Sequence, residues 1–152
     1  MLSRTSLGLA VLALLTAVTV YAADEIKLDG VKCFVNPKAA AKAATGVDYK
    51  GGKVFFCCMN CPKAFAADTA KFAAKANHQL VATGQAKQEK CPFSGEPIDA
   101  GTKIDVSGAS VAFCCDMCKA KASESKEQVE LIFNDKAFEK AGFKVAKAEK
   151  KE

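Results

Sequence analysis

The stretch VFFCCMNC (residues 54–61) returns 57 residues later as VAFCCDMC (residues 111–118). Each copy places an apolar, strand-like run before a doubled cysteine, and a third cysteine follows three residues after the doublet. One inserted residue in the first copy also aligns Cys33 with Cys91, so the two patterns are C-x23-C-C-x2-C and C-x22-C-C-x2-C. A near-register repeat of all eight cysteines indicates two copies of one module.

The sequence around each doublet predicts the same local structure. Residues 46–58 (GVDYKGGKVFFCC) and 104–115 (IDVSGASVAFCC) alternate apolar and polar residues around a glycine turn, which is typical of a β-hairpin. An alanine-rich helical segment follows, with Asn60 as its predicted N-cap and Gly84 as its end, and Asp116 is the predicted N-cap in the second copy. Each module is therefore a small α+β unit: a loop with one cysteine, a β-hairpin, paired cysteines and a helix.

The N-terminal residues have the three parts of a secretory signal peptide. Arg4 precedes an apolar run at residues 7–20, and the small-residue pattern Val20-Tyr21-Ala22 comes just before acidic sequence. The run is too short for a comfortable membrane span of about 20 residues. We therefore expect a periplasmic or secreted protein with no membrane association after cleavage. The predicted organisation is a signal peptide (1–22), a first module with a helical extension (23–84), a second module with a C-terminal helix (85–145) and a polar tail (146–152). The first residues of the second module, QAKQEK (85–90), are predicted to be a linker between the two modules.

Composition argues against several classes of function. The chain has 22 Lys+Arg against 17 Asp+Glu, and Arg4 is its only arginine. Nucleic-acid recognition favours arginine and clustered charge, whereas these lysines are scattered and fit solvated helical faces. The sequence contains no paired carboxylates, Ser-His-Asp set or phosphate loop, so we expect neither enzymatic activity nor a nucleic-acid partner.

The cysteines allow more than one chemistry. In an oxidising compartment, eight cysteines suggest a disulfide framework. The spacing favours metal, because the last cysteine of each copy lies at a predicted helix N-terminus, where free N–H groups stabilise thiolates. With the leading cysteine brought across by the hairpin, three soft sulfur ligands would suit Zn(II) or Cu(I) rather than Mg(II) or Ca(II).

The chain resembles the TRASH and YHS-type metal-binding modules, relatives of a treble-clef-like zinc finger. The resemblance lies in CPFSGEPI (91–98) before VAFCCDMC, and in CFVNP (33–37) before VFFCCMNC. It covers nearly all of the chain after residue 22 and implies two tandem treble-clef or zinc-ribbon-like modules with one zinc or copper(I) ion each. Family members are associated with sensing, trafficking and resistance of heavy metals. The ligands that it implies are Cys33, Cys57 and Cys61 in the first module and Cys91, Cys114 and Cys118 in the second.

The fourth coordination position is open in the sequence. Four-cysteine relatives have another cysteine three positions after the first, where this chain has Asn36 and Ser94. Structural zinc sites are almost always closed by four protein ligands. The candidate additional ligands are Cys58, Cys115 and His78. The competing interpretation of the two middle cysteines is that they are small buried residues or spare thiols.

Two other classes of function compete with metal handling. Residues 58–61 and 115–118 are both C-x-x-C at a predicted helix start, the arrangement of thiol–disulfide proteins, although no βαβ pattern surrounds them. Alternatively, zinc could only stabilise two modules whose surfaces bind another protein. We expect an exported soft-metal carrier, buffer or sensor component, whose partners are the metal ion and a metal-donor or metal-acceptor protein.

Overall fold

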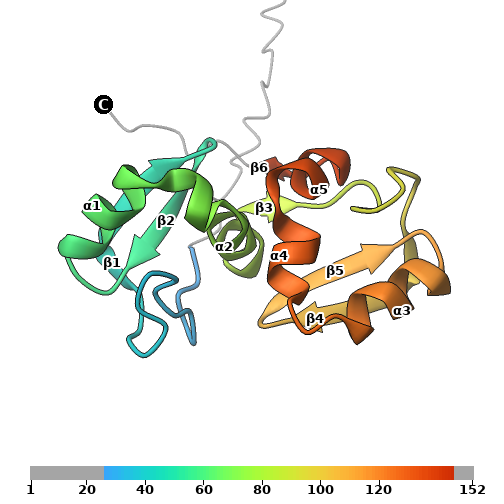
Figure 1. Cartoon of the computed structure of the whole chain (residues 1–152), viewed down its shortest axis with the longest axis horizontal. Coiled ribbons are helices and arrows are strands. Elements are labelled where there is room, and N and C mark those ends of the chain that lie inside the picture. The colour runs from blue at the N-terminus through green and yellow to red at the C-terminus, as the bar shows by residue number, and fades with distance from the viewer. Residues whose placement is uncertain (1–25, 146–152) are drawn as a thin grey trace, which may run out of the picture.

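The computed structural model describes residues 26–145 of the chain (Figure 1). The predicted signal peptide and the polar tail lie outside the described residues. The elements along the chain are β1 (Lys42–Tyr49), β2 (Gly52–Phe56), α1 (Asn60–Ala67), α2 (Thr69–Ala82), β3 (Ala86–Lys87), β4 (Asp99–Val106), β5 (Ala109–Phe113), α3 (Asp116–Glu124), α4 (Gln128–Phe133), α5 (Asp135–Lys140) and β6 (Lys144–Val145). They form three two-stranded antiparallel sheets and five helices, so the predicted α+β class is confirmed.

Both predicted hairpins are present. β1 pairs with β2 and β4 pairs with β5, each across a two-residue turn. The turns are Lys50-Gly51 (φ 47° and 87°) and Ser107-Gly108 (φ 51° and 89°). Positive φ at both central residues is the conformation that matches the twist of the flanking strands, and glycine adopts it without steric cost.

The helical segments are shorter than the sequence pattern predicts. The first is divided at Asp68, whose side chain accepts a hydrogen bond from the Lys71 amide at 3.1 Å and so begins α2. The second is interrupted at residues 125–127, between α3 and α4, and again at Asn134, which caps α5 by accepting from the Ala137 amide at 3.0 Å. In both cases a residue that competes for backbone hydrogen bonds ends one helix and starts the next.

The two predicted N-caps are wrong by one residue. Asn60 and Asp116 are the first helical residues, and the caps are Met59 and Cys115. Neither cap makes a side-chain hydrogen bond to the helix. Cys115 is still extended (φ −162°, ψ 167°), so α3 begins directly after the chain leaves β5.

The halves of the chain share one hydrophobic core. Helix α2, which follows the first hairpin, packs against α4 and β5 of the second half and lies between the two hairpins in Figure 1. Asn77 on α2 is fully buried and donates to the Phe133 carbonyl at 2.9 Å and to Asp135 at 3.0 Å. Lys50 in the first turn forms an ion pair with Asp135 at 2.7 Å. Hydrogen bonding by Lys50 and Asn77 lowers the pKa of the Asp135 carboxyl.

The segment predicted as a linker, residues 85–90, contains a strand. β3 within it pairs with β6, which comes last among the described elements. Beside this sheet, Lys144 forms an ion pair with Glu89 at 2.7 Å. The linker is therefore held on both sides by later parts of the chain.

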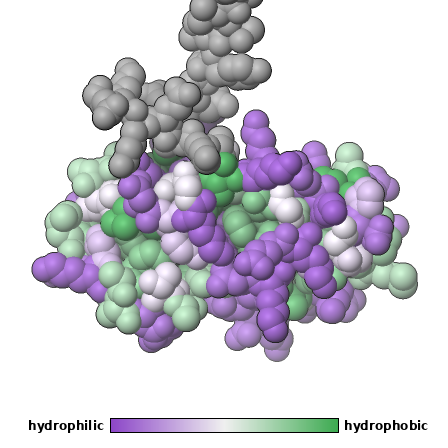
Figure 2. All heavy atoms as spheres, turned by 90° about the horizontal axis from the view of Figure 1, so that it is seen from above, coloured by the Kyte–Doolittle hydropathy of each residue, from purple (hydrophilic) through white to green (hydrophobic). Residues whose placement is uncertain are grey.

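Charged and polar side chains cover much of the surface. Figure 2 shows hydrophilic side chains spread over both halves of one face of the molecule, as expected for scattered, solvated lysines. Within residues 26–145, no helix is both long enough and apolar enough to cross a bilayer.

His78 on α2 contacts the second half of the chain. Its Nε2 lies 2.7 Å from the Val106 carbonyl oxygen, which can only accept, so this nitrogen carries the proton. Its ring also packs edge-on against Phe133, with centroids 5.1 Å apart. Burial lowers the pKa of His78, although the Val106 carbonyl and Asp105 oppose that shift.

Acidification is therefore expected to destabilise the native protein through His78. A lowered folded-state pKa means that the unfolded chain binds more protons below about pH 6.5, so the free energy of unfolding falls as pH decreases through that value. His78→Gln keeps an amide donor without a titrating group. Urea unfolding at pH 7.5 and 5.5 should show a smaller acid-induced loss for the variant, and equal losses in the two proteins would contradict this role.

Candidate metal centres

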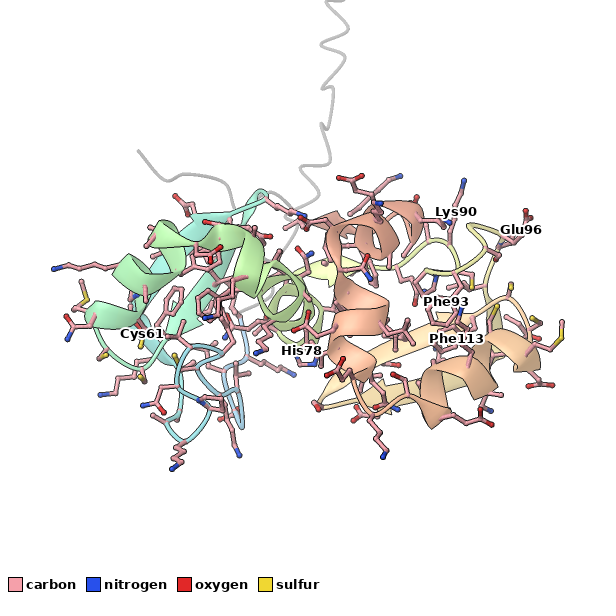
Figure 3. The ribbon with its side chains drawn as sticks, in the orientation of Figure 1. Cys61, His78, Lys90, Phe93, Glu96 and Phe113 are labelled. Atoms are coloured by element: carbon pink, nitrogen blue, oxygen red, sulfur yellow. The ribbon has the colours of Figure 1, made fainter. Side chains whose placement is uncertain are left out.

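The structure brings the six predicted ligands together in two clusters of three. In each cluster, all three Sγ atoms lie within 4.8 Å of one another. Figure 3 labels Cys61 in the first half, and Phe93 and Phe113 beside the second cluster at the opposite end of the molecule. Cluster one consists of Cys33, Cys57 and Cys61, and cluster two consists of Cys91, Cys114 and Cys118.

A threonine fixes the end of each hairpin next to its cysteine doublet. Thr45 Oγ1 accepts from the Phe56 amide at 3.2 Å and donates to the Lys42 carbonyl at 2.8 Å. At the equivalent place Thr102 Oγ1 accepts from the Phe113 amide at 2.8 Å and also hydrogen-bonds the Phe113 carbonyl at 2.6 Å. Both threonines lie where the hairpin register shifts. They stabilise a bulge that sets the direction of the strand just before Cys57 in the first half and Cys114 in the second.

A glutamine side chain binds the free edge of each of these strands. Gln79 on α2 accepts from the Phe55 amide at 2.6 Å and donates to its carbonyl at 3.0 Å. In the same way, the Gln88 side chain accepts from the Ala112 amide at 2.9 Å and donates to the Ala112 carbonyl at 2.8 Å. An edge strand otherwise leaves these groups without a protein partner. The side-chain amides of the two glutamines therefore hold the backbone at the position two residues before Cys57 and Cys114.

These positioning residues were not identified from the sequence. Thr45 and Thr102 are separated by the repeat offset of 57, so a full self-alignment would have paired them. Gln79 and Gln88 do not occupy equivalent positions of the two repeats, because Gln79 lies on α2 and Gln88 lies after β3. No local pattern connects either glutamine with the strand that it binds.

Each leading cysteine lies in a tight loop held by backbone bonds. The Cys33 amide donates to the Ala39 carbonyl at 3.0 Å, and the Cys91 amide donates to the Glu96 carbonyl at 2.8 Å. Both cysteines are fully buried. The Asn36 amide donates to Cys33 Sγ at 3.4 Å, so the loop directs an N–H group at the sulfur.

The thiols of a cluster do not ionise alike. Burial raises the pKa of Cys91, but hydrogen bonds from the backbone and hydroxyl of Ser94 outweigh it and lower that pKa to about 6. The pKa of Cys33 is also lowered, by backbone N–H groups that outweigh burial. Burial and the neighbouring thiols raise the pKa of Cys118 to about 12, and they raise that of Cys61 as well. In each cluster the leading cysteine therefore loses its proton more easily than the last one, and a metal must displace protons from the thiols that remain protonated, so its affinity rises with pH.

The sulfur separations fit a metal ion. Cys57 and Cys61 Sγ are 3.6 Å apart, and Cys114 and Cys118 Sγ are 3.7 Å apart. Two zinc–sulfur bonds of about 2.3 Å at the tetrahedral angle would place the sulfurs about 3.8 Å apart. Three thiols within 4.8 Å of one another match the donor preference of Zn(II) and Cu(I). Each cluster could therefore hold one metal ion without a large movement of its cysteines.

The candidate fourth ligands occupy different places. Cys58 is exposed with its Sγ 3.6 Å from Cys61, and Cys115 Sγ is 3.7 Å from Cys114. Neither belongs to the group of three mutually close sulfurs in its half. His78 is in neither cluster and binds the Val106 carbonyl instead. The structure thus places two thiols at the rims of the clusters and the imidazole in the contact between the halves.

Comparison of the chain with protein-family models, with curated proteins and with solved structures found no match. The family resemblance given by the cysteine motifs therefore remains a prediction.

Proposed function

We propose that this chain is a non-enzymatic metal-binding protein that holds one Zn(II) or Cu(I) ion in each half and acts as a carrier, buffer or sensor component in heavy-metal handling. The observation that supports it most is the repeated cluster of three Sγ atoms within 4.8 Å of one another. If the clusters were chance groupings of cysteines, they would not be expected to form at equivalent positions of both repeats.

Several features of the proposal come from the sequence. Export to the periplasm or the exterior rests on residues 1–22, and the treble-clef-like description of each module rests on the family resemblance. The presence of a cysteine loop, a hairpin and a helix around each cluster is compatible with such modules. A protein that donates or accepts the metal is the partner that this function requires.

The exposed thiol of the first half supports metal exchange over permanent structural binding. Cys58 is solvent-exposed and 3.6 Å from the ligand candidate Cys61. Thiolate ligands are exchanged most easily when an incoming sulfur can approach the ion from solvent. Backbone N–H groups of Asn60 and Cys61 lower the pKa of Cys58 to about 7, so this thiol is partly ionised at neutral pH.

The contact between the Cys58 and Cys61 sulfurs also favours thiol–disulfide exchange as a second candidate function. Cys58 and Cys61 form a C-x-x-C pair at the start of α1 with their sulfurs already adjacent. A low-pKa exposed thiol beside a high-pKa buried one is the arrangement of many redox-active pairs. In this function the protein would cycle between dithiol and disulfide without metal.

Metal analysis of anaerobically purified protein, with a parallel count of free thiols, separates the two functions. We expect about two equivalents of zinc or copper per chain if each cluster holds one ion. Four disulfides and no metal would refute the proposal. A metal-free protein with free thiols that cycles reversibly with a disulfide reagent would favour the redox function.

A further inference from the structure

The two clusters differ at the position three residues after the leading cysteine. In cluster two this position is Ser94, whose hydroxyl donates to Cys114 Sγ at 3.2 Å. The Glu96 amide donates to the same oxygen at 3.2 Å. The hydroxyl is therefore oriented by the backbone and directed toward the cluster.

At the equivalent position of cluster one, the side chain of Asn36 forms a hydrogen bond within its own loop. Asn36 Oδ1 accepts from the Lys38 amide at 3.4 Å, within its own loop. Only the backbone amide of Asn36 contacts a ligand candidate, Cys33 Sγ, at 3.4 Å. Each cluster has a rim thiol, Cys58 or Cys115, but within residues 26–145 only cluster two has a hydroxyl that hydrogen-bonds one of its sulfurs.

The distance to Ser94 fits a direct ligand. Bonds of about 2.1 Å to oxygen and about 2.3 Å to sulfur, at the tetrahedral angle, separate the two ligand atoms by about 3.6 Å. The observed separation of 3.2 Å is about 0.4 Å shorter than that value, so the hydroxyl oxygen would have to move away from Cys114 Sγ by about that amount to bind the ion. Oxygen suits Zn(II), which accepts mixed donors in a tetrahedral site, more than it suits Cu(I), which selects soft sulfur.

We infer that Ser94 is a specificity-determining residue, whose hydroxyl fills the fourth coordination position of cluster two and makes it a Zn(II) site with three sulfurs and one oxygen. Cluster one, with sulfur donors only, is by comparison the better Cu(I) site. This inference rests on the proposed metal-binding function. It adds that one chain carries two chemically different centres.

The test measures Zn(II) and Cu(I) affinities of each cluster separately by competition with a chromophoric chelator. Cys61→Ser disables cluster one and leaves cluster two for measurement, and Cys118→Ser does the reverse. In the Cys61→Ser chain, Ser94→Ala should weaken Zn(II) binding by at least the roughly 10–100-fold that loss of an outer-shell partner costs, and should leave Cu(I) binding within about threefold. Asn36→Ala in the Cys118→Ser chain is the matched control and should leave both affinities unchanged.

Ser94→Cys provides a second variant in case alanine disturbs the loop. A sulfur at this position should retain or tighten Zn(II) binding, and with Co(II) as probe it should strengthen the thiolate-to-metal charge-transfer band. Metal binding in both chains with no effect of either Ser94 variant would overturn the inference and leave the proposed function standing. Absence of metal binding in both single-cluster chains would overturn the proposed function itself.

Discussion

Replacing Cys61 by serine is expected to empty one metal centre and leave the other filled. Cys61 is 7% exposed, and its Sγ is one of the three mutually close sulfurs of cluster one. Removing it takes one thiol from the mutually close set, so affinity should fall by more than the roughly 10–100-fold that loss of an outer-shell partner costs. Metal analysis should show about one equivalent in place of about two.

The neighbouring cysteine provides the matched control. Cys58→Ser removes a thiol 3.6 Å from Cys61 that lies outside the mutually close set, so the variant should retain both ions. Cys118→Ser should empty cluster two in the same way that Cys61→Ser empties cluster one. Loss of both ions from either single-cluster variant would argue against independent sites.

The second large effect is expected from Phe133→Ala, which should destabilise both halves at once. Phe133 is fully buried, packs edge-on against His78, and its carbonyl accepts from Asn77. Truncation of a buried phenylalanine costs about 3–5 kcal/mol in the free energy of unfolding. For a chain of this size that corresponds to a decrease in Tm on the order of 10–15 °C.

Calorimetry of the metal-loaded protein measures this effect. Since the halves share one core, the variant should unfold in a single transition at the lower temperature. Phe72→Ala, on the half-buried side of α2, is the control and should cost less. Two separate transitions, with only the second half destabilised, would show that the halves fold independently.

The hairpins and cysteine clusters were accessible from the sequence because their signals are local or repeated. Alternation around Gly51 and Gly108 predicts both hairpins, since a tight turn of this type requires positive φ. The repeat offset pairs the cysteines without any structural knowledge. Two near-identical cysteine patterns constrain the fold more strongly than one pattern of the same length.

The helix boundaries were not accessible to the same degree. Asp68 and Asn134 lie inside segments with continuous helical periodicity, and each acts as a cap only because its side chain reaches an amide three residues ahead. A polar residue on the exposed face of an uninterrupted helix would give the same sequence pattern as a capping residue.

The role of His78 and the pairing of β3 with β6 depend on contacts between distant residues. The Val106 carbonyl that binds His78 is 28 residues away, and no local pattern points to it. β3 and β6 are two residues long each, too short for alternation to be recognised. A lone histidine among alanines and a polar linker therefore carried no sign of their structural roles.

The position of β6 has a consequence for the order in which the protein can fold. A Cβ atom on Gly52, at the start of β2, would lie 2.9 Å from Val145 Cγ1, so the last described strand packs directly onto the first hairpin. Domains usually begin to fold as they leave the ribosome, N-terminal part first. Here the first module acquires its full covering only after the second has been synthesised. Newly made chains therefore spend the translation time of the entire second repeat with a first hairpin whose turn end still lacks the strand that covers it.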